Sequence, residues 1–166
     1  MRTYRVIESP VGPLTAVSTD GVLSGLYMAD AAHLPATFGE PSQPAGQSGA
    51  DRLEAELAEY FAGDRTVFTV PTAAVGTPFQ VRVWEALVEI PYGTTRSYLD
   101  LALALGDARL VRAVGAANGR NPLSIVVPCH RVVGSDGTLT GYAGGVARKE
   151  MLLALEDPRR RADTLF

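Results

Sequence analysis

The stretch TPFQVRVWEALVEIP, from Thr77 to Pro91, decides the fold of the second half of the chain. Thr77 is a typical helix N-cap, Pro78 suits the first helical position, and Gln80 completes a Thr-x-x-Gln capping box. Apolar residues at helical spacing form one stripe, namely Phe79, Val83, Trp84 and Leu87. Pro91 ends the pattern, because a proline disfavours helical conformation in the residue before it. The stretch therefore predicts an amphipathic helix.

Two shorter helices are expected next. SYLDLALALG starts with Ser97 as its cap and ends at Gly106, and DARLVRAVGAANG follows over 107–119. Two short helices joined by a tight turn resemble a helix-turn-helix. The same geometry is common in proteins that never bind DNA, so helix spacing alone favours plain packing. After the glycine-rich loop TGYAGG, the segment VARKEMLLALED (146–157) predicts a final helix.

The first 75 residues follow a different pattern. TYRVIES, LTAVST and VLSGLYM are separated by Pro/Gly and Asp-Gly turns, which predicts an antiparallel meander. Residues 31–50 are rich in Ala, Gly, Pro, Ser and Gln and are expected to form a loose loop. The segment at 51–63 predicts a helix, and RTVFTVP (65–71) predicts a further short strand. LSIVVP, at 123–128, predicts a buried strand or extended run.

The composition limits the class of protein. The chain has 166 residues, 46% of them hydrophobic and 20% charged, which suits a globular protein with a substantial core. Its start does not read as a signal peptide, and no apolar run is long enough to span a bilayer. One cysteine forms no internal disulfide, so we expect a cytoplasmic protein. One cysteine and two histidines also argue against a structural zinc site.

The net charge of −3 is unevenly distributed. Residues 1–75 carry four basic and nine acidic side chains, whereas residues 76–166 carry eleven basic and nine acidic ones. An acidic chain does not by itself indicate nucleic-acid binding, so any such surface is expected to be local and in the second half.

The single cysteine, Cys129, lies in the segment IVVPCHRVVG. Free cysteines are often buried and inert. Here His130 and Arg131 follow directly, and both would favour the nucleophilic thiolate. Adjacent side chains on a strand point to opposite faces, so a Cys129–His130 contact requires a turn or a bridging water. Glu150 and Glu156 on the last helix are the candidates to hold the histidine.

The absence of a second cysteine also limits the chemistry. A thiol oxidoreductase that resolves its intermediate through an internal partner thiol is excluded. A hydrolase-like covalent cycle stays open, and so does a thiol that accepts a group and keeps it.

The helix expected at 107–119 has a face of small residues. It contains one arginine, Arg112, among Ala113, Gly115, Ala116, Ala117 and Gly119. Such a face allows another surface to approach closely, whether a neighbouring helix or a nucleic-acid groove. Arg120 and Arg96 flank the region and would suit contacts with phosphates.

Taken together, these residues resemble a known family. The segment that carries the resemblance is PCHRVVG, which is preceded by RAVGAANGRNP and followed by TGYAGG and RKEMLLALE. It is similar to the O6-alkylguanine-DNA alkyltransferases, also called methylated-DNA–[protein]-cysteine S-methyltransferases. Bacterial Ogt-type members are the most similar. The similarity covers residues 76–157 and extends to SPVGPL near the start. It implies an α+β fold with an N-terminal ribonuclease H-like α/β domain (1–75) and a mostly helical C-terminal domain (76–166) that contains a helix-turn-helix.

The resemblance implies DNA repair by direct, irreversible transfer of an alkyl group from O6-methylguanine to the protein's own cysteine, with O4-methylthymine left open. The damaged base would flip out of the duplex into a pocket. The helix at about 108–119 would bind the minor groove, whose contacts depend little on sequence. Each molecule would act once, without S-adenosylmethionine, another cofactor or a metal. The expected partner is double-stranded DNA and not a membrane; we expect a monomer, with cooperative binding along DNA left open.

The resemblance also assigns roles to residues. In the catalytic set, Cys129 would be the nucleophile, His130 the base through a water, and Glu156 the residue that orients the histidine. Tyr98 would rotate the target phosphodiester and donate to the departing guanine, and Asn121 would be the hinge. The DNA-binding set is Arg112, which would intercalate, with Ala113, Gly115, Ala116, Gly119, Arg120 and Tyr98. The substrate pocket would include Val132, Tyr142, Ala143 and Lys149. Ala143 stands where some members carry serine, so the size of the accepted alkyl group stays open.

Two other functions remain as alternatives. Alkyltransferase-like proteins bind lesions without repairing them and replace the reactive cysteine, whereas Cys129 is present here. A thiol hydrolase with a Cys-His pair would need an oxyanion hole, and nothing in the sequence singles one out.

Overall fold

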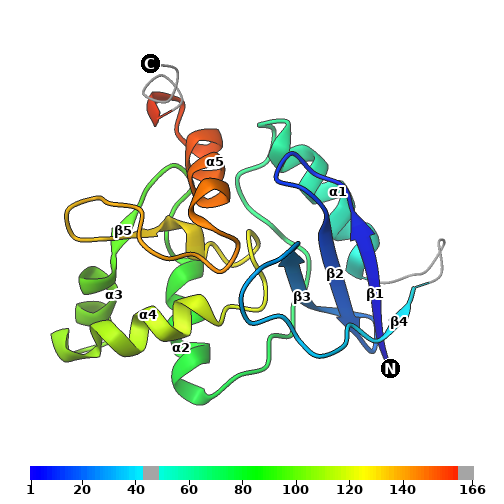
Figure 1. Cartoon of the computed structure of the whole chain (residues 1–166), viewed down its shortest axis with the longest axis horizontal. Helices are drawn as coiled ribbons and strands as arrows, with labels where there is room; N and C mark the ends of the chain where they lie inside the picture. Colours follow the sequence, from blue (N-terminus) through cyan, green and yellow to red (C-terminus); the bar gives the residue numbers. More distant parts are fainter. Residues whose placement is uncertain (43–48, 161–166) are drawn as a thin grey trace. The chain divides into compact units, whose positions relative to one another are not determined.

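The computed structural model of the chain describes residues 1–42 and 49–160 (Figure 1). The chain divides into two compact units. The first comprises Met1–Val75 with Pro122–Val126, and the second comprises Gly76–Asn121 with Val127–Phe166. The assignment of an N-terminal ribonuclease H-like domain over residues 1–75 stays a prediction.

The first unit is built on a four-stranded sheet in the order β3-β2-β1-β4 (Figure 1). Three strands pair antiparallel, as the turn pattern predicted: β1 (Arg2–Ile7), β2 (Leu14–Thr19) and β3 (Val22–Met28). The short β4 (Glu40–Pro41) pairs parallel to β1, so the prediction of a loose loop over 31–50 was wrong at these two residues. Of the same stretch, residues 43–48 lie outside the described residues.

The helix α1 (Gly49–Phe61) packs against β2 and β3. It buries Leu53, Leu57 and Tyr60 together with one acidic residue, Glu56. This helix begins two residues before the predicted range, inside the stretch expected to be a loop.

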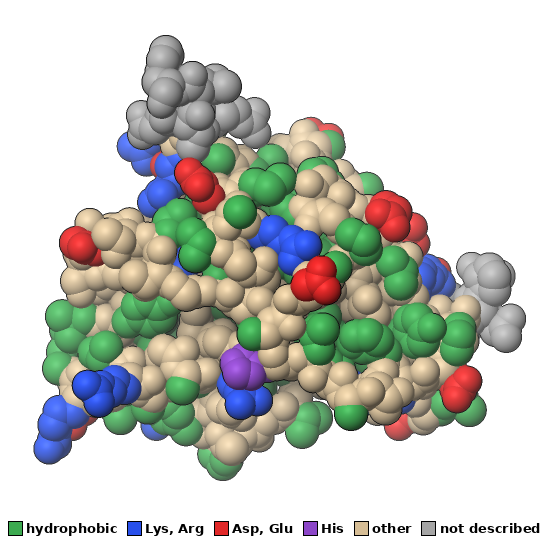
Figure 2. All heavy atoms as spheres, viewed as in Figure 1, with side chains coloured by type: hydrophobic (Ala, Val, Ile, Leu, Met, Phe, Trp, Pro, Cys, Tyr) green, Lys and Arg blue, Asp and Glu red, His purple; other side chains and the backbone are tan. Residues whose placement is uncertain are grey.

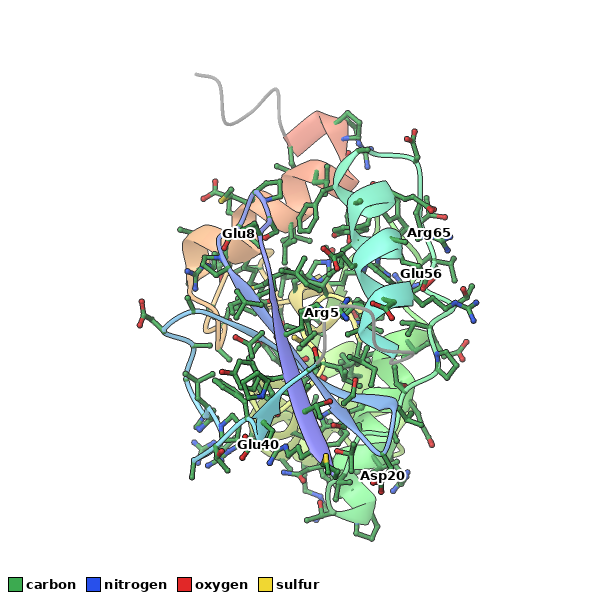
Figure 3. All side chains as sticks on the ribbon, turned by 90° about the vertical axis from the view of Figure 1, so that its right-hand side faces the viewer. Arg5, Glu8, Asp20, Glu40, Glu56 and Arg65 are labelled. Carbon is green, nitrogen blue, oxygen red and sulfur yellow. The ribbon has the colours of Figure 1, made fainter. Side chains whose placement is uncertain are left out.

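The strand predicted at 65–71 is absent, because the carboxylate of Glu56 binds its backbone instead. The backbone N–H of Thr69 donates to Glu56 Oε1 at 2.9 Å, and that of Val70 donates to the same oxygen at 2.8 Å. Arg65 Nη1 lies 3.1 Å from Glu56 Oε2, and Figure 3 shows the two side chains next to α1. Only a single bridge, between Leu23 and Thr72, links this region to the sheet.

The segment Pro122–Val126 forms part of the first unit as an extended run with a tight turn. Leu26 N–H donates to Pro122 O at 2.8 Å, and Ser124 N–H donates to Leu26 O at 3.2 Å. Ile125 then adopts φ +72°, which is rare for a β-branched residue, and Val126 N–H closes a three-residue turn on Ser124 O at 2.8 Å. Of the two predicted alternatives for 123–128, a buried strand or an extended run, the structure has the extended run, with a strained turn at Ile125.

The second unit is mainly helical (Figure 1). Its elements are α2 (Pro78–Val88), β5 (Arg96–Ser97), α3 (Tyr98–Ala104), the 3-10 turn η1 (Ala108–Leu110), α4 (Val111–Gly119), the 3-10 turn η2 (Cys129–Arg131), β6 (Val132–Val133) and α5 (Val146–Glu156). In the described part of the chain, no helix has the length and apolarity needed to cross a bilayer.

Capping contacts set the helix ends of this unit. The capping box of Thr77 and Gln80 is present at the start of α2, as predicted. Ser97 caps α3, with Asp100 completing the box. The helix predicted from 107 starts instead as the turn η1, since Asp107 caps Arg109 N–H, and regular α-helix begins at Val111. α4 packs against both α2 and α3.

We expect Glu56→Gln to lower the free energy of unfolding by about 2 kcal/mol, since a buried charged acceptor is replaced by an amide whose N–H₂ opposes two backbone donors. Urea unfolding at neutral pH measures this. Glu59→Gln is the matched control, because Glu59 also pairs with Arg65 but is exposed. Equal losses in the two variants would contradict the special role of Glu56.

The same carboxylate predicts a pH dependence. Burial raises the pKa of Glu56, but hydrogen bonds from Thr69 and Val70 and the charge of Arg65 outweigh burial and lower it. Its stabilising contribution is therefore complete above the unfolded-state pKa and is lost as pH falls through the folded-state pKa. The difference in unfolding free energy between the native chain and Glu56→Gln should therefore shrink as the pH falls. Urea unfolding of both chains at neutral and acid pH measures this difference.

Candidate active site

Cys129 begins the 3-10 turn η2, directly after Pro128. Pro128 has φ −81° and ψ 63°, and Cys129 N–H donates to Val127 O at 2.8 Å, so a tight turn precedes the thiol. Asn121 Nδ2 donates to the same carbonyl at 2.8 Å. This turn ends the apolar run and places the cysteine side chain in the interior, 4% exposed.

The polar surroundings of the thiol come from residues distant in sequence. Burial raises the pKa of the Cys129 thiol, while hydrogen bonds from the Asn121 and Tyr142 side chains and the charge of Lys149 lower it; burial prevails. The resting thiol is therefore mainly protonated, with groups in place that favour the thiolate.

Lys149, on α5, is fully buried. Its Nζ donates to Thr140 O at 3.1 Å and lies 6.0 Å from the ring centre of Tyr98, whose hydroxyl donates to the same Thr140 carbonyl at 3.3 Å. Burial lowers the pKa of Lys149, and the nearby Cys129 raises it. Lys149 thus lies close to two other predicted site residues, Tyr98 and Cys129, at the loop that contains Thr140.

The His130 side chain is fully buried and bonded to Glu156. Its Nε2 lies 2.7 Å from Glu156 Oε2 at the end of α5, whereas Glu150 is exposed. The other ring nitrogen, Nδ1, is buried and has no hydrogen-bond partner within residues 1–42 and 49–160. His130 therefore makes no direct hydrogen bond to the thiol, and Nδ1 is the nitrogen available to bind a proton.

Arg131 was expected to favour the thiolate by its charge, but its guanidinium is engaged elsewhere. Nε lies 2.8 Å from Glu156 Oε1 and Nη2 lies 3.0 Å from Glu156 Oε2. Nη1 donates to Ile90 O at 2.7 Å. Burial raises the pKa of Glu156, but the hydrogen bonds and charges of His130 and Arg131 outweigh burial and lower it to about 2. The charge of Arg131 is therefore engaged by Glu156, and not by the Cys129 thiolate as had been expected.

One face of α4 is exposed and carries the small residues. Arg112, Ala113, Ala116 and Arg120 are exposed, whereas Val114, Ala117 and Asn118 are buried. A Cβ added at Gly119 would meet nothing within 4 Å, and one added at Gly115 would only reach Tyr98 at 4.0 Å. Internal packing therefore does not require glycine at either position, so the small residues suit the approach of an external surface.

The buried face of α4 connects to the rest of the unit. Trp84 Nε1 donates to Ala117 O at 2.9 Å, and Asn118 Nδ2 donates to Cys129 O at 3.4 Å. Reasoning from the sequence missed Asn118, and for Arg131 it missed the contact with Glu156. A buried polar side chain in a helix, or an arginine within a buried run, is the signal that could have found them.

The remaining predicted residues lie as follows. Val132 is buried and pairs with Arg96 in the short sheet of β5 and β6. Ala143 is half-buried. A hollow of about 690 Å³ between α2 and α3 is lined by other residues, including Glu89, Arg96 and Asp100, and contains none of the predicted pocket residues.

Comparison with known proteins identifies the family. The family model of the 6-O-methylguanine DNA methyltransferase DNA-binding domain matches residues 78–158. A methylated-DNA–protein-cysteine methyltransferase of Mycobacterium tuberculosis is 50% identical over 165 residues, which is 98% of each chain. The constitutive enzyme of that name from Bacillus subtilis is 42% identical over 159 residues, covering 94% of this chain and 96% of the other. This chain belongs to the methylated-DNA–protein-cysteine methyltransferases.

A solved structure agrees with this family assignment. The crystal structure of Mycobacterium tuberculosis OGT in complex with DNA matches with a TM-score of 0.86 at 48% identity, over 95% of this chain and 94% of that chain. The small sheet with helices and the mixed α+β class are those of this methyltransferase structure.

In this family member, Lys149→Met is expected to raise the pKa of the Cys129 thiol further, because the nearby positive charge is lost. The rate of alkylation by iodoacetamide as a function of pH measures this without interference, since Cys129 is the single cysteine of the chain. Lys149→Arg, which keeps the charge, is the control. An unchanged profile for Lys149→Met would show that Lys149 does not stabilise the thiolate.

Proposed function

We propose that this methyltransferase repairs DNA by moving the alkyl group of O6-alkylguanine to the sulfur of Cys129, once per molecule. The observation that carries this proposal is the buried thiol, whose thiolate form Asn121, Tyr142 and Lys149 favour, and which is followed directly by the His130–Glu156 pair. Relatives that are named methylated-DNA–protein-cysteine methyltransferases support it, as does a neighbour crystallised with DNA.

The transfer requires a proton acceptor for the thiol and a proton donor for guanine. Glu156 holds Nε2 of His130, and the thiol proton passes to Nδ1 through a bridging water. The sulfur attacks the alkyl carbon, the bond from carbon to O6 breaks, and its electron pair leaves with the base. Tyr98 donates to the departing guanine, so the proton given up by the thiol balances the one that guanine gains.

The lone cysteine accounts for a single turnover. The product is a thioether, and neither a second thiol nor an activated leaving group is available within the chain to release it. The lesion itself supplies the alkyl group, so the reaction we propose uses no cofactor. We further propose a cytoplasmic location, because a chain whose reactive thiol stands alone suits a reducing compartment.

DNA would bind through α3 and α4, arranged as a helix-turn-helix. The exposed small face of α4 suits close approach to the minor groove, with Arg112 inserted into the base stack and Arg120 on a phosphate. In the face shown in Figure 2, cationic and anionic side chains are interspersed. The net charge of −3 likewise favours binding through a local surface and not through a general positive field.

Incubation with duplex DNA containing O6-methylguanine is expected to add one methyl group per chain, located on Cys129 by peptide mass spectrometry. The amount of product should equal the amount of protein and then stop increasing. Cys129→Ala should give no transfer. An unchanged mass together with tight binding would instead indicate a lesion-binding protein, and sustained turnover would indicate a hydrolase.

Ala116→Leu is expected to weaken binding to duplex DNA by about tenfold or more, about 1.4 kcal/mol, because a bulky side chain holds the exposed face of α4 away from the groove. Fluorescence anisotropy with labelled DNA measures the affinity. Ala58→Leu makes the same change at an exposed position of α1 and should bind as the native chain does. Equal affinities for both variants would place the DNA surface elsewhere.

A further inference from the structure

Arg131 is a buried cation that faces no open surface and whose three nitrogen atoms are all engaged. It is 6% exposed. Two of its nitrogens bind the two carboxylate oxygens of Glu156, and the third binds the carbonyl of Ile90. Its guanidinium carbon also lies 5.7 Å from the ring centre of Tyr92. Such a guanidinium fixes the plane of the carboxylate that it binds on both oxygens.

One oxygen of this carboxylate is shared. Glu156 Oε2 lies 2.7 Å from His130 Nε2 and 3.0 Å from Arg131 Nη2. The orientation of the imidazole therefore depends on a carboxylate that Arg131 holds. Arg131 and Glu156 have opposite electrostatic effects on the imidazole. The carboxylate anion favours the protonated form, and a cation bound to that anion weakens this preference.

The other charges near this group are few. On α5, Lys149 lies near Cys129, and directly after this helix Asp157 pairs with the exposed Arg159. On α2, Arg82 and Glu85 are exposed, as is Glu89 directly after the helix. From the segment after this helix, the carbonyl of Ile90 and the ring of Tyr92 contact Arg131. Within the described residues, Arg131 is thus the cation that balances Glu156.

We propose that Arg131 is a positioning residue for the transfer reaction: it fixes the carboxylate of Glu156 against His130 and limits how strongly that carboxylate favours the protonated imidazole. Its guanidinium binds Glu156 and the carbonyl of Ile90, and it acts through Glu156. The inference rests on the function proposed above, in which a neutral His130 takes up the thiol proton.

The test is the single-turnover rate of methyl transfer to Cys129, at saturating methylated DNA, from pH 5 to pH 9. Arg131→Met removes the positive charge that binds both oxygens of Glu156, so the pH below which the rate falls should move up. Arg131→Lys keeps the charge but cannot bind both oxygens and the carbonyl. It should keep the pH dependence while lowering the rate above pH 8 several-fold. Arg159→Met, which removes an exposed arginine from the same helix end, should match the native profile.

Combining variants distinguishes a positioning role of Arg131 from a merely structural one. Above pH 8, Glu156→Gln should slow transfer, and adding Arg131→Met to it should slow transfer little more, because both act through one contact. Independent, multiplicative losses would overturn the proposal. So would a native pH profile in Arg131→Met. Where loss of the buried cation prevents Arg131→Met from folding, Arg131→Lys decides, since its native rate at every pH would also overturn the proposal.

Failure of the underlying function gives a different result. If the native chain gains no methyl group on Cys129, the proposed function is wrong. If the native chain transfers normally while the Arg131 variants follow its rate and pH profile, only the role of Arg131 is wrong.

Discussion

The buried carboxylate of Glu156 is the contact on which the arrangement of the site depends. It binds two consecutive residues of η2, His130 and Arg131, from the end of α5, and Arg131 extends the contact to the carbonyl of Ile90. Three segments that are distant in sequence thus meet at one charge. A buried charge is tolerated only when its hydrogen-bonding positions are filled. The turn that carries Cys129 is therefore tied to a network in which each member needs the others.

Burial and reactivity oppose each other at the thiol. Burial keeps Cys129 protonated, whereas Asn121, Tyr142 and Lys149 favour the thiolate. For a cysteine that can be used only once, a standing thiolate would be a disadvantage, because oxidants consume thiolates more readily than thiols. In the proposed mechanism, a protonated thiol with a base and donors already in place stays intact until an alkyl carbon lies against it. The high burial is thus part of the function and does not indicate an inert cysteine.

How far the sequence predicts the structure depends on the range of each interaction. The capping box at Thr77 and the strands of the meander follow from residues close in sequence, and both are present. The strand predicted at 65–71 failed because a carboxylate 13 residues earlier binds its backbone. The partner of Arg131 lies 25 residues away, so its neighbours in sequence do not reveal it. Likewise, nothing local to Ile125 predicts φ +72°, because the surrounding packing imposes it.

The helix α4 brings the two halves of the proposed function together. Its exposed face carries the small residues and Arg112, while its buried face bonds to Trp84 through Ala117 O and to the carbonyl of Cys129 through Asn118. A helix is stiff over nine residues, so a surface that docks on one face fixes its distance from whatever the other face holds. Small side chains shorten that distance without requiring any movement of the backbone. Close approach and nucleophile position are therefore set by the same element, and the thiol does not need to leave its buried position to meet a base that is flipped toward it.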